Sequence, residues 1–208
     1  MLFAEALHIT RGVAAIIGSG GKTSLMYRLA QELQGRVIVC TSTQIFPPKH
    51  IPFVQRIEAF EGTVCVGTPC PNGKLGPPEQ SFEELAEIAD YVLVEADGSK
   101  HLPLKAHAPH EPVIPNKATQ RITVVGASGL NQPISEVVHR HEIFYDLTQS
   151  ALATPQAVAA CLQTEALGDR IFINQTDTNE CAARELAELL PWPVTLGSLQ
   201  KGEIICSY

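Results

Sequence analysis

Apolar and polar residues alternate along the chain in blocks that predict a repeated order of strand and helix. Short apolar runs bounded by polar or glycine residues are typical of buried strands. Between them lie segments whose apolar residues recur at helical spacing, as expected for parallel strands joined by helices. Strands are predicted at 13–17, 36–41, 63–67, 90–95, 121–126 and 170–174, helices at 25–33, 81–89, 155–162 and 178–190, and an edge strand at 194–196.

A glycine-rich turn separates the first predicted strand from the first predicted helix. It reads Gly18-Ser19-Gly20-Gly21-Lys22-Thr23-Ser24. Glycines let main-chain N–H groups point inward, and a helix N-terminus adds a partial positive charge, so this context favours phosphate binding. Lys22 is expected to reach the terminal phosphates and the Thr23 hydroxyl to ligate Mg²⁺. The sequence therefore predicts a single α/β domain of the P-loop NTPase type over residues 1–208, with a mostly parallel sheet and helices on both faces.

Composition limits the classes of partner. Of the 208 residues, 45% are hydrophobic and 18% charged, as in ordinary globular proteins, and a formal net charge of −7 argues against a generic nucleic-acid or anionic membrane surface. No apolar run approaches membrane-spanning length, and the N-terminus lacks a signal-peptide pattern. The six cysteines form no C-x-x-C pair, which favours reduced thiols and a cytoplasmic location.

Carboxylate and hydroxyl groups follow two of the predicted strands. Glu95 and Asp97 end the strand at 90–95, and Thr41-Ser42-Thr43 ends the strand at 36–41. The carboxyl ends of parallel strands are where ligands bind in such sheets, and Mg²⁺ prefers oxygen ligands. We expect Asp97 to be the main Mg²⁺ ligand, with Glu95 as a second ligand or as the base that orients water. Thr43 is a further candidate for the metal shell.

Asn174-Gln175-Thr176-Asp177, after a late strand, resembles the N-K-x-D motif with which GTP-binding proteins recognise the base. An aspartate accepts hydrogen bonds from N1–H and N2–H₂ of guanine, which adenine cannot supply. Asn174 and Asp177 are therefore expected to contact the base. Gln175 replaces the usual lysine, so GTP is favoured while ATP stays open; a plain turn that caps the next helix is the alternative.

Residues 98–118 are rich in proline and histidine and predict an ordered lid or insertion within the domain. Lys100, Lys105 and Arg140 are candidates for contacting an anionic substrate or the nucleotide phosphates. The histidines in and after this segment suggest a transition-metal site, although their spacing dictates no ligand geometry. They are His101, His107, His110, His139 and His141.

Taken together, these motifs resemble the selenium-dependent hydroxylase accessory protein family, also called the YqeC family. The resemblance is carried by residues 18–23, by Thr41-Ser42-Thr43 with Ile45-Phe46-Pro47-Pro48, by residues 94–99 with Leu102-Pro103-Leu104-Lys105, by residues 110–115, by His139-Arg140 and by residues 174–177. Ser42 and Gln175 depart from the family pattern. The resemblance implies a P-loop protein that assists maturation of selenium-dependent molybdenum hydroxylases, with such an enzyme or its cofactor as partner. It does not define the reaction.

The leading hypothesis is a cytoplasmic Mg²⁺-dependent NTPase that uses GTP or ATP and binds neither nucleic acid nor membranes. The glycine loop would cradle the phosphates, Lys22 would stabilise the transferring phosphoryl group, and Thr23 with Asp97 would hold Mg²⁺. Two alternatives stay open. One is a small-molecule kinase or ligase that uses the same loop, and the other is a non-enzymatic carrier of a metal or cofactor through His101, His107, His110 and His139.

Overall fold

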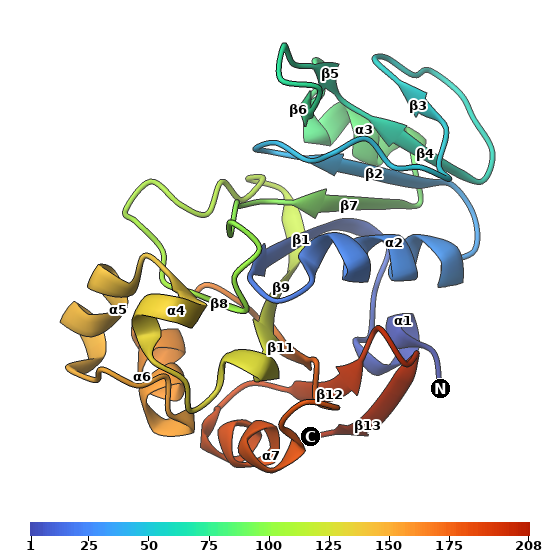
Figure 1. Cartoon of the computed structure of the whole chain (residues 1–208). Helices are drawn as coiled ribbons and strands as arrows, with labels where there is room; N and C mark the ends of the chain where they lie inside the picture. The colour runs from blue at the N-terminus through green and yellow to red at the C-terminus, as the bar shows by residue number, and fades with distance from the viewer.

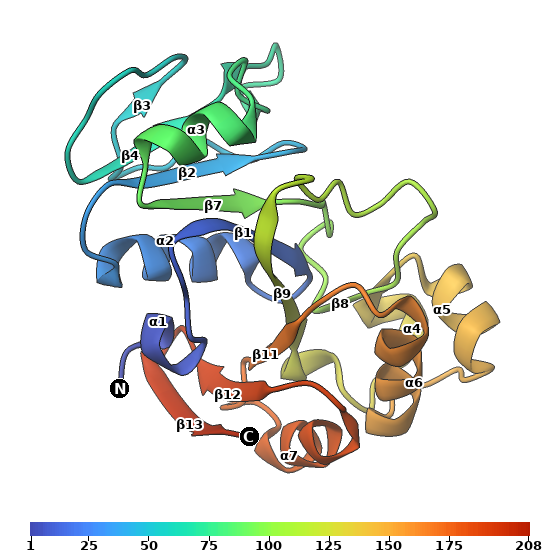
Figure 2. The same cartoon turned by 180° about the vertical axis from the view of Figure 1, so that it is seen from behind.

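The computed structural model describes residues 1–208 and is built on a nine-stranded sheet. Figures 1 and 2 show that helices cover both faces of this sheet, as the sequence predicts for an α/β fold of the P-loop NTPase type. The sheet contains β1 (Gly12–Gly18), β2 (Val37–Thr41), β3 (Phe53–Val54), β4 (Thr63–Val66), β7 (Tyr91–Glu95), β9 (Ala118–Gly126), β11 (Arg170–Asn174), β12 (Val194–Ser198) and β13 (Glu203–Ser207).

The helices and the smaller strands complete the fold. Two short pairs stand apart from the main sheet, an antiparallel hairpin and a parallel pair. The pairs are β5 (Thr68–Pro69) with β6 (Leu75–Gly76) and β8 (Leu104–Lys105) with β10 (Val138–His139). The helices are α1 (Phe3–Ala6), α2 (Lys22–Glu32), α3 (Phe82–Ile88), α4 (Ile134–Val137), α5 (His141–Thr148), α6 (Pro155–Glu165) and α7 (Glu180–Leu189), with a 3₁₀ turn at Ala127–Gly129. No helix is long and apolar enough to cross a membrane.

The strand order places the glycine loop at the centre of the sheet. The order is β13-β12-β11-β9-β1-β7-β2-β4-β3, and all neighbours are parallel except β12 and β13. β1 lies between β7 and β9, with Ile16 beside Glu95 and Gly18 beside Val124. The strand predicted at 194–196 exists, but its placement at the edge is wrong, because β13 pairs antiparallel to β12 and forms that edge.

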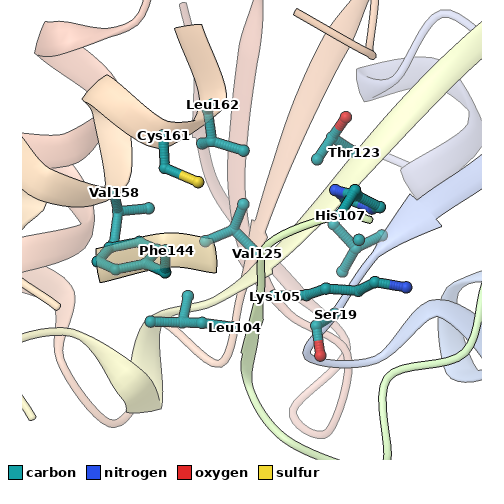
Figure 3. A pocket seen from close by; sticks show the side chains of 12 residues that line it. Ser19, Leu104, Lys105, His107, Thr123, Val125, Phe144, Val158, Cys161 and Leu162 are labelled. Carbon is teal, nitrogen blue, oxygen red and sulfur yellow. The ribbon is translucent and has the colours of Figure 1, made fainter. Parts of the chain in front are cut away.

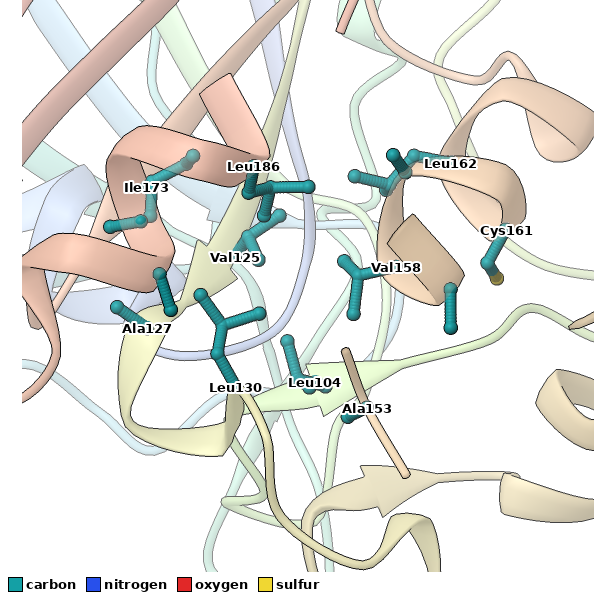
Figure 4. Close-up of a cluster of buried hydrophobic side chains, with 14 of the residues drawn as sticks. Leu104, Val125, Ala127, Leu130, Ala153, Val158, Cys161, Leu162, Ile173 and Leu186 are labelled. Atoms are coloured by element: carbon teal, nitrogen blue, oxygen red, sulfur yellow. The ribbon is translucent and has the colours of Figure 1, made fainter. Parts of the chain in front are cut away.

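Strand alternation divides the apolar residues between the two faces of the sheet. In β11, Phe172 packs on the face covered by α1 and α2, where its ring meets Phe3 edge-on at 5.7 Å between centroids. Its neighbours Ile171 and Ile173 point to the opposite face, into a cluster with α5, α6 and α7. Figure 4 shows part of that cluster, with Leu104 and Leu130 packed among residues of these helices and of β9.

The middle of this second face is covered by residues 104–118 rather than by a helix. Leu104, Ala106 and Ala108 are buried, and the Val113 N–H bonds to the Ala96 carbonyl at 2.9 Å. Residues 104–108 therefore belong to the core, and the prediction of a lid over 98–118 does not describe them. Residues 98–102 instead line an open cleft, described below.

Most predicted element boundaries agree with the structure to within a few residues. Ser81 caps α3, accepting from the Glu84 N–H while the Glu84 side chain accepts from the Ser81 N–H, as the sequence predicts. The expected helix at 25–33 already begins at Lys22, directly after the glycine turn. The stretch 68–78, expected to be loop, contains the small β5–β6 hairpin.

Candidate functional site

The glycine loop forms a cradle of main-chain N–H groups between β1 and α2. Gly20 and Gly21 have φ of +87° and +126°, and a Cβ on Gly21 would strike the Asn174 side-chain nitrogen. The N–H groups of Gly20, Gly21, Thr23 and Ser24 donate to no acceptor within the protein. They line an open cleft at the positive end of the α2 dipole. Such a row of free donors at a helix N-terminus is suited to binding an anion.

Lys22 lies at the base of this cradle and is almost completely buried. Its ammonium donates to the Gly18 carbonyl at 2.6 Å and lies 3.0 Å from Asp97 Oδ1. Asp97 Oδ1 accepts no hydrogen bond of acceptable geometry, so the contact is a charge pair. Lys22 also contributes to the lining of the cleft, but its ammonium is held at the base of the cradle by Asp97 and the Gly18 carbonyl.

Asp97 lies behind the loop and does not line the cleft. Its Oδ2 accepts the Gly18 N–H at 2.9 Å and lies 2.8 Å from His107 Nε2 and 3.4 Å from Lys105 Nζ. Burial alone would raise the pKa of this carboxyl, but the His107 hydrogen bond and the Lys22 and Lys105 charges lower it to about 2. Asp97 is thus a buried anion that fixes the start of the loop.

His107 joins Asp97 to α6. Its Nδ1 lies 2.8 Å from Glu165 Oε2, and its main-chain N–H donates to Glu165 Oε1 at 2.6 Å. With a carboxylate at each ring nitrogen, the imidazolium form donates to both. Burial opposes this charge, yet the two hydrogen bonds outweigh it and raise the pKa of His107.

Lys105 connects the same cluster to Glu111 on the cleft side. Its ammonium lies 2.9 Å from Glu111 Oε2 and donates to the Gly98 carbonyl at 2.6 Å. Arg140 pairs with the other Glu111 oxygen at 3.0 Å. These bonds outweigh partial burial and lower the pKa of Glu111. Lys105 and Arg140, both predicted to contact a substrate, are therefore bound to protein carboxylates.

A small cavity lies between this cluster and the α5–α6 core. Figure 3 shows Ser19, Lys105 and Thr123 on one side and Phe144 and Leu162 on the other. Its volume is about 20 Å³, which is space for a single water molecule. The ligand-sized space therefore lies on the other side of the glycine loop.

Glu95 is the carboxylate that faces the cleft. Thr23 Oγ1 donates to Glu95 Oε2 at 2.6 Å, and both residues line the cleft. Burial raises the pKa of Glu95, opposed by the Lys22 charge and the Thr23 hydrogen bond. The Thr41 hydroxyl bonds to the Glu95 carbonyl at 2.7 Å and receives the Thr43 N–H at 3.0 Å. Thr43 does not line the cleft, so the oxygens that face it here are those of Thr23 and Glu95. These oxygens match the ligand preference of Mg²⁺.

The motif at 174–177 lies on the other side of the loop. Asn174 Nδ2 donates to the Gly20 carbonyl at 2.7 Å, and Asn174 Oδ1 accepts the Leu199 N–H at 3.0 Å, so Asn174 braces the cradle. Asp177 is exposed, and a hydrogen bond from Ser198 lowers its pKa. Both line a second cleft of about 510 Å³, called here the base cleft; its lining also includes Tyr27, Arg28, Ser128, Gln175, Ser198 and Leu199.

The first cleft, called here the front cleft, has a volume of about 600 Å³. It is lined by residues 20–24, 44–46, 74, 95, 98–102, 111, 139 and 175. Of the predicted histidines, His101 and His139 face it, His107 is buried behind the loop, and His110 is exposed. No group of three or more histidine, cysteine, aspartate or glutamate side chains is arranged to hold a metal ion.

Comparison with known proteins adds a family. The YqeC protein family model matches residues 14–142, which contain the glycine loop, Glu95, Asp97 and His107. The chain belongs to the YqeC family. A relative from Escherichia coli (strain K12), described as uncharacterized protein YqeC, is 36% identical over 154 residues, which cover 65% of this chain and 60% of the relative. No solved structure matches the chain. The family match ends before Asn174 and Asp177, so it gives no support to the base cleft.

Sequence reasoning missed the ionic cluster behind the loop. Glu165 meets His107 across 58 residues of chain, and Ser198 meets Asp177 from another strand. Neither partner stands in a motif, so no local pattern signalled it. The alternation rule also grouped Glu95 with Asp97, but β7 ends at Glu95, and Asp97 bonds to Gly18 instead.

Proposed function

We propose that this protein binds a Mg²⁺–nucleoside triphosphate in the cradle of the glycine loop and hydrolyses it. The observation that carries the proposal is the row of four N–H groups without acceptors, at Gly20, Gly21, Thr23 and Ser24. The first N–H groups of a helix have no partner within the helix, and here they face an open cleft at its positive end, which suits an anionic ligand.

The surrounding side chains fit the same ligand. Lys22 places a positive charge under the cradle, and the Ser19 hydroxyl donates to the carbonyl of Leu102, a residue of the cleft wall, which ties the loop to that wall. Thr23 and Glu95 present paired oxygens that would hold Mg²⁺, whereas Thr43 lies outside the cleft lining. Bound Mg²⁺ would neutralise phosphate charge. Glu95 is also the group within reach of a water at the terminal phosphate.

In this proposal Asp97 acts through other residues. It holds the Gly18 N–H and the Lys22 ammonium and does not touch the nucleotide. We therefore propose Glu95, in place of Asp97, as the main carboxylate ligand of Mg²⁺. This assignment follows from the cleft lining, which contains Glu95 and lacks Asp97.

The base cleft supports guanine as the preferred base. Asp177 is exposed there and, with its pKa lowered by Ser198, ionised at neutral pH, which suits two N–H donors on one edge of a guanine. Asn174 fixes the distance between this cleft and the cradle through Gly20. ATP is the competing nucleotide. The family resemblance supports a place for this activity in the maturation of selenium-dependent molybdenum hydroxylases, with the client enzyme or its cofactor as partner.

Calorimetric titration with GTP, ATP and CTP, with and without Mg²⁺, tests binding, and release of inorganic phosphate tests hydrolysis. Lys22→Ala is expected to weaken triphosphate binding at least about ten-fold and to abolish turnover. Thr23→Val keeps the shape of the side chain and is expected to remove the gain in affinity from Mg²⁺. Asp177→Asn should reduce the preference for GTP.

Lys117→Ala provides the matched control, because Lys117 is exposed and lies outside both clefts. Circular dichroism of each variant separates lost binding from lost folding. Absence of triphosphate binding by the wild-type protein, or full affinity in a folded Lys22→Ala variant, would overturn the proposal.

A further inference from the structure

The front cleft contains more space and more charge than a triphosphate needs. The base cleft and the front cleft meet at Gly21, Ser24 and Gln175, on either side of the cradle. A nucleotide with its phosphates on residues 20–24 and its base at Asp177 occupies the base cleft and only the near side of the front cleft. The rest of the lining, called here the far side, consists of residues 44–46, 74, 100, 101 and 139 and would remain open.

Two lysines at this far side have no counter-ion. Lys74 and Lys100 take part in no ion pair, whereas Lys105 and Arg140 are both held by Glu111. The Lys74 ammonium lies over the ring of Phe46 at 4.9 Å from its centroid, a cation–π contact that positions the charge without neutralising it. In a chain of formal charge −7, two free cations in one cleft form a local positive site.

The carboxylates of this cleft do not cancel that charge. Glu111 is paired with Lys105 and Arg140, and Glu95 lies at the cradle, where it accepts the Thr23 hydroxyl and faces the Lys22 charge. His139, on the same wall, is also surrounded by positive charge. Burial lowers its pKa, and so do the charges of Lys105, Arg140 and Lys100. The far side of the cleft is therefore positive where it is open to a ligand.

The kind of cation indicates the kind of anion. The planar fork of arginine binds carboxylate and phosphate in a bidentate way, but no arginine lines this cleft, and Arg140, the neighbour of its lining residue His139, is paired with Glu111. Lysine acts as a point charge and suits the tetrahedral phosphate group. His101 and His139 add ring nitrogens on the same wall. With Phe46 and Leu102 beside them, the cleft also offers apolar surface for the body of an organic molecule.

We propose that the far side of the front cleft binds a second substrate, a small organic phosphate, held by Lys74 and Lys100 next to the terminal phosphate of the bound nucleotide. This inference rests on the proposed nucleotide site and specifies what that site acts with. A volume of about 600 Å³ lies within the range of small-molecule sites, which is ample for a phosphomonoester beside a triphosphate end.

The test is a two-stage titration with glycerol 2-phosphate as the probe. The protein is first saturated with Mg²⁺ and a non-hydrolysable GTP or ATP analogue, which fills the cradle. Glycerol 2-phosphate is then titrated into the loaded protein, with glycerol as the uncharged comparison. Lys74→Gln and Lys100→Gln remove one charge each while keeping most of the side-chain length, and Lys117→Gln removes an exposed lysine outside the cleft.

We expect the loaded protein to bind glycerol 2-phosphate and not glycerol, and either cleft variant to weaken this binding about ten-fold while Lys117→Gln leaves it unchanged. No binding of the probe to the loaded protein overturns the inference and leaves the nucleotide site intact. Weakened binding of the nucleotide analogue in the lysine variants, without probe binding, also overturns it, because the lysines then contact the nucleotide itself. Failure of the analogue to bind in the first stage overturns the proposed function and this inference with it.

Discussion

Replacing Asp97 by asparagine tests the claim that a buried anion holds the glycine loop together. The side chain is fully buried and faces three cationic groups, Lys22 at 3.0 Å, His107 at 2.8 Å and Lys105 at 3.4 Å. The substituted amide would keep the shape and lose the charge, leaving these cations in a buried site with less compensation. Removing one partner of a buried ion pair costs about 3–5 kcal/mol of unfolding free energy.

The lowered pKa of Asp97 expresses part of this cost as a dependence of stability on pH. A fall from 3.8 to about 2 corresponds to roughly 2 kcal/mol in favour of the folded state. Because the folded pKa is depressed, this stabilisation is complete above pH 3.8 and is lost as the pH falls toward about 2. The destabilisation by Asp97→Asn should therefore shrink in strong acid, as the pH falls toward about 2.

Urea unfolding at pH 6, followed by circular dichroism, measures the effect. Asp97→Asn should lower the unfolding free energy by about 3–5 kcal/mol, and adding Lys22→Met should restore part of it, because one unpaired cation is removed. Asp146→Asn, on an exposed side chain without an ion pair, should change it by less than about 0.5 kcal/mol. A loss below about 1 kcal/mol for Asp97→Asn, or strict additivity of Asp97→Asn and Lys22→Met, would refute the reasoning.

Two further predictions concern the cluster behind the loop and the core. Because the pKa of His107 is raised, the stabilisation that its protonated ring provides should be complete below pH 6.5 and should fall as the pH rises through the folded pKa. His107→Gln should remove this pH dependence from urea midpoints measured between about pH 5.5 and 9. Parallel profiles for the two proteins would contradict it. Phe172→Ala should lower the unfolding free energy by about 3–5 kcal/mol in the same assay, because Phe172 is fully buried against Phe3. A loss below about 1 kcal/mol would show that the face of the sheet under α1 and α2 is loosely packed.

The main strands and the glycine loop could be predicted from the sequence because both depend on local pattern. β1, β7 and β11 are short apolar runs buried on both faces, and the turn at 18–24 has a composition that few other structures require. The two-residue strands β8 and β10 are too short to give a period, and β13 has no fully buried residue. These elements depend on pairing with distant strands, which a single sequence does not display.

The residues that line the front cleft could be predicted from the sequence, but the buried ionic cluster behind the glycine loop could not. The sequence placed Lys22, Thr23 and Glu95 at one sheet edge, and the structure brings all three to the same cleft. It could not show that residues 104–108, in a segment rich in proline and histidine, pack into the core, because that composition is also typical of exposed loops. The roles of Asp97 and His107 depend on that burial.

The position of β1 has a consequence for how the chain folds. This strand is made early in synthesis, yet its two neighbours, β7 and β9, lie at residues 91–95 and 118–126, and the brace on its loop comes from Asn174. Contacts between residues so far apart in sequence form slowly, because a long stretch of chain must first be ordered. A ribosome-bound fragment that stops before residue 118 would thus leave one edge of this central strand unpaired. The first strand of the sheet to be synthesised is therefore among the last to have both neighbouring strands in place.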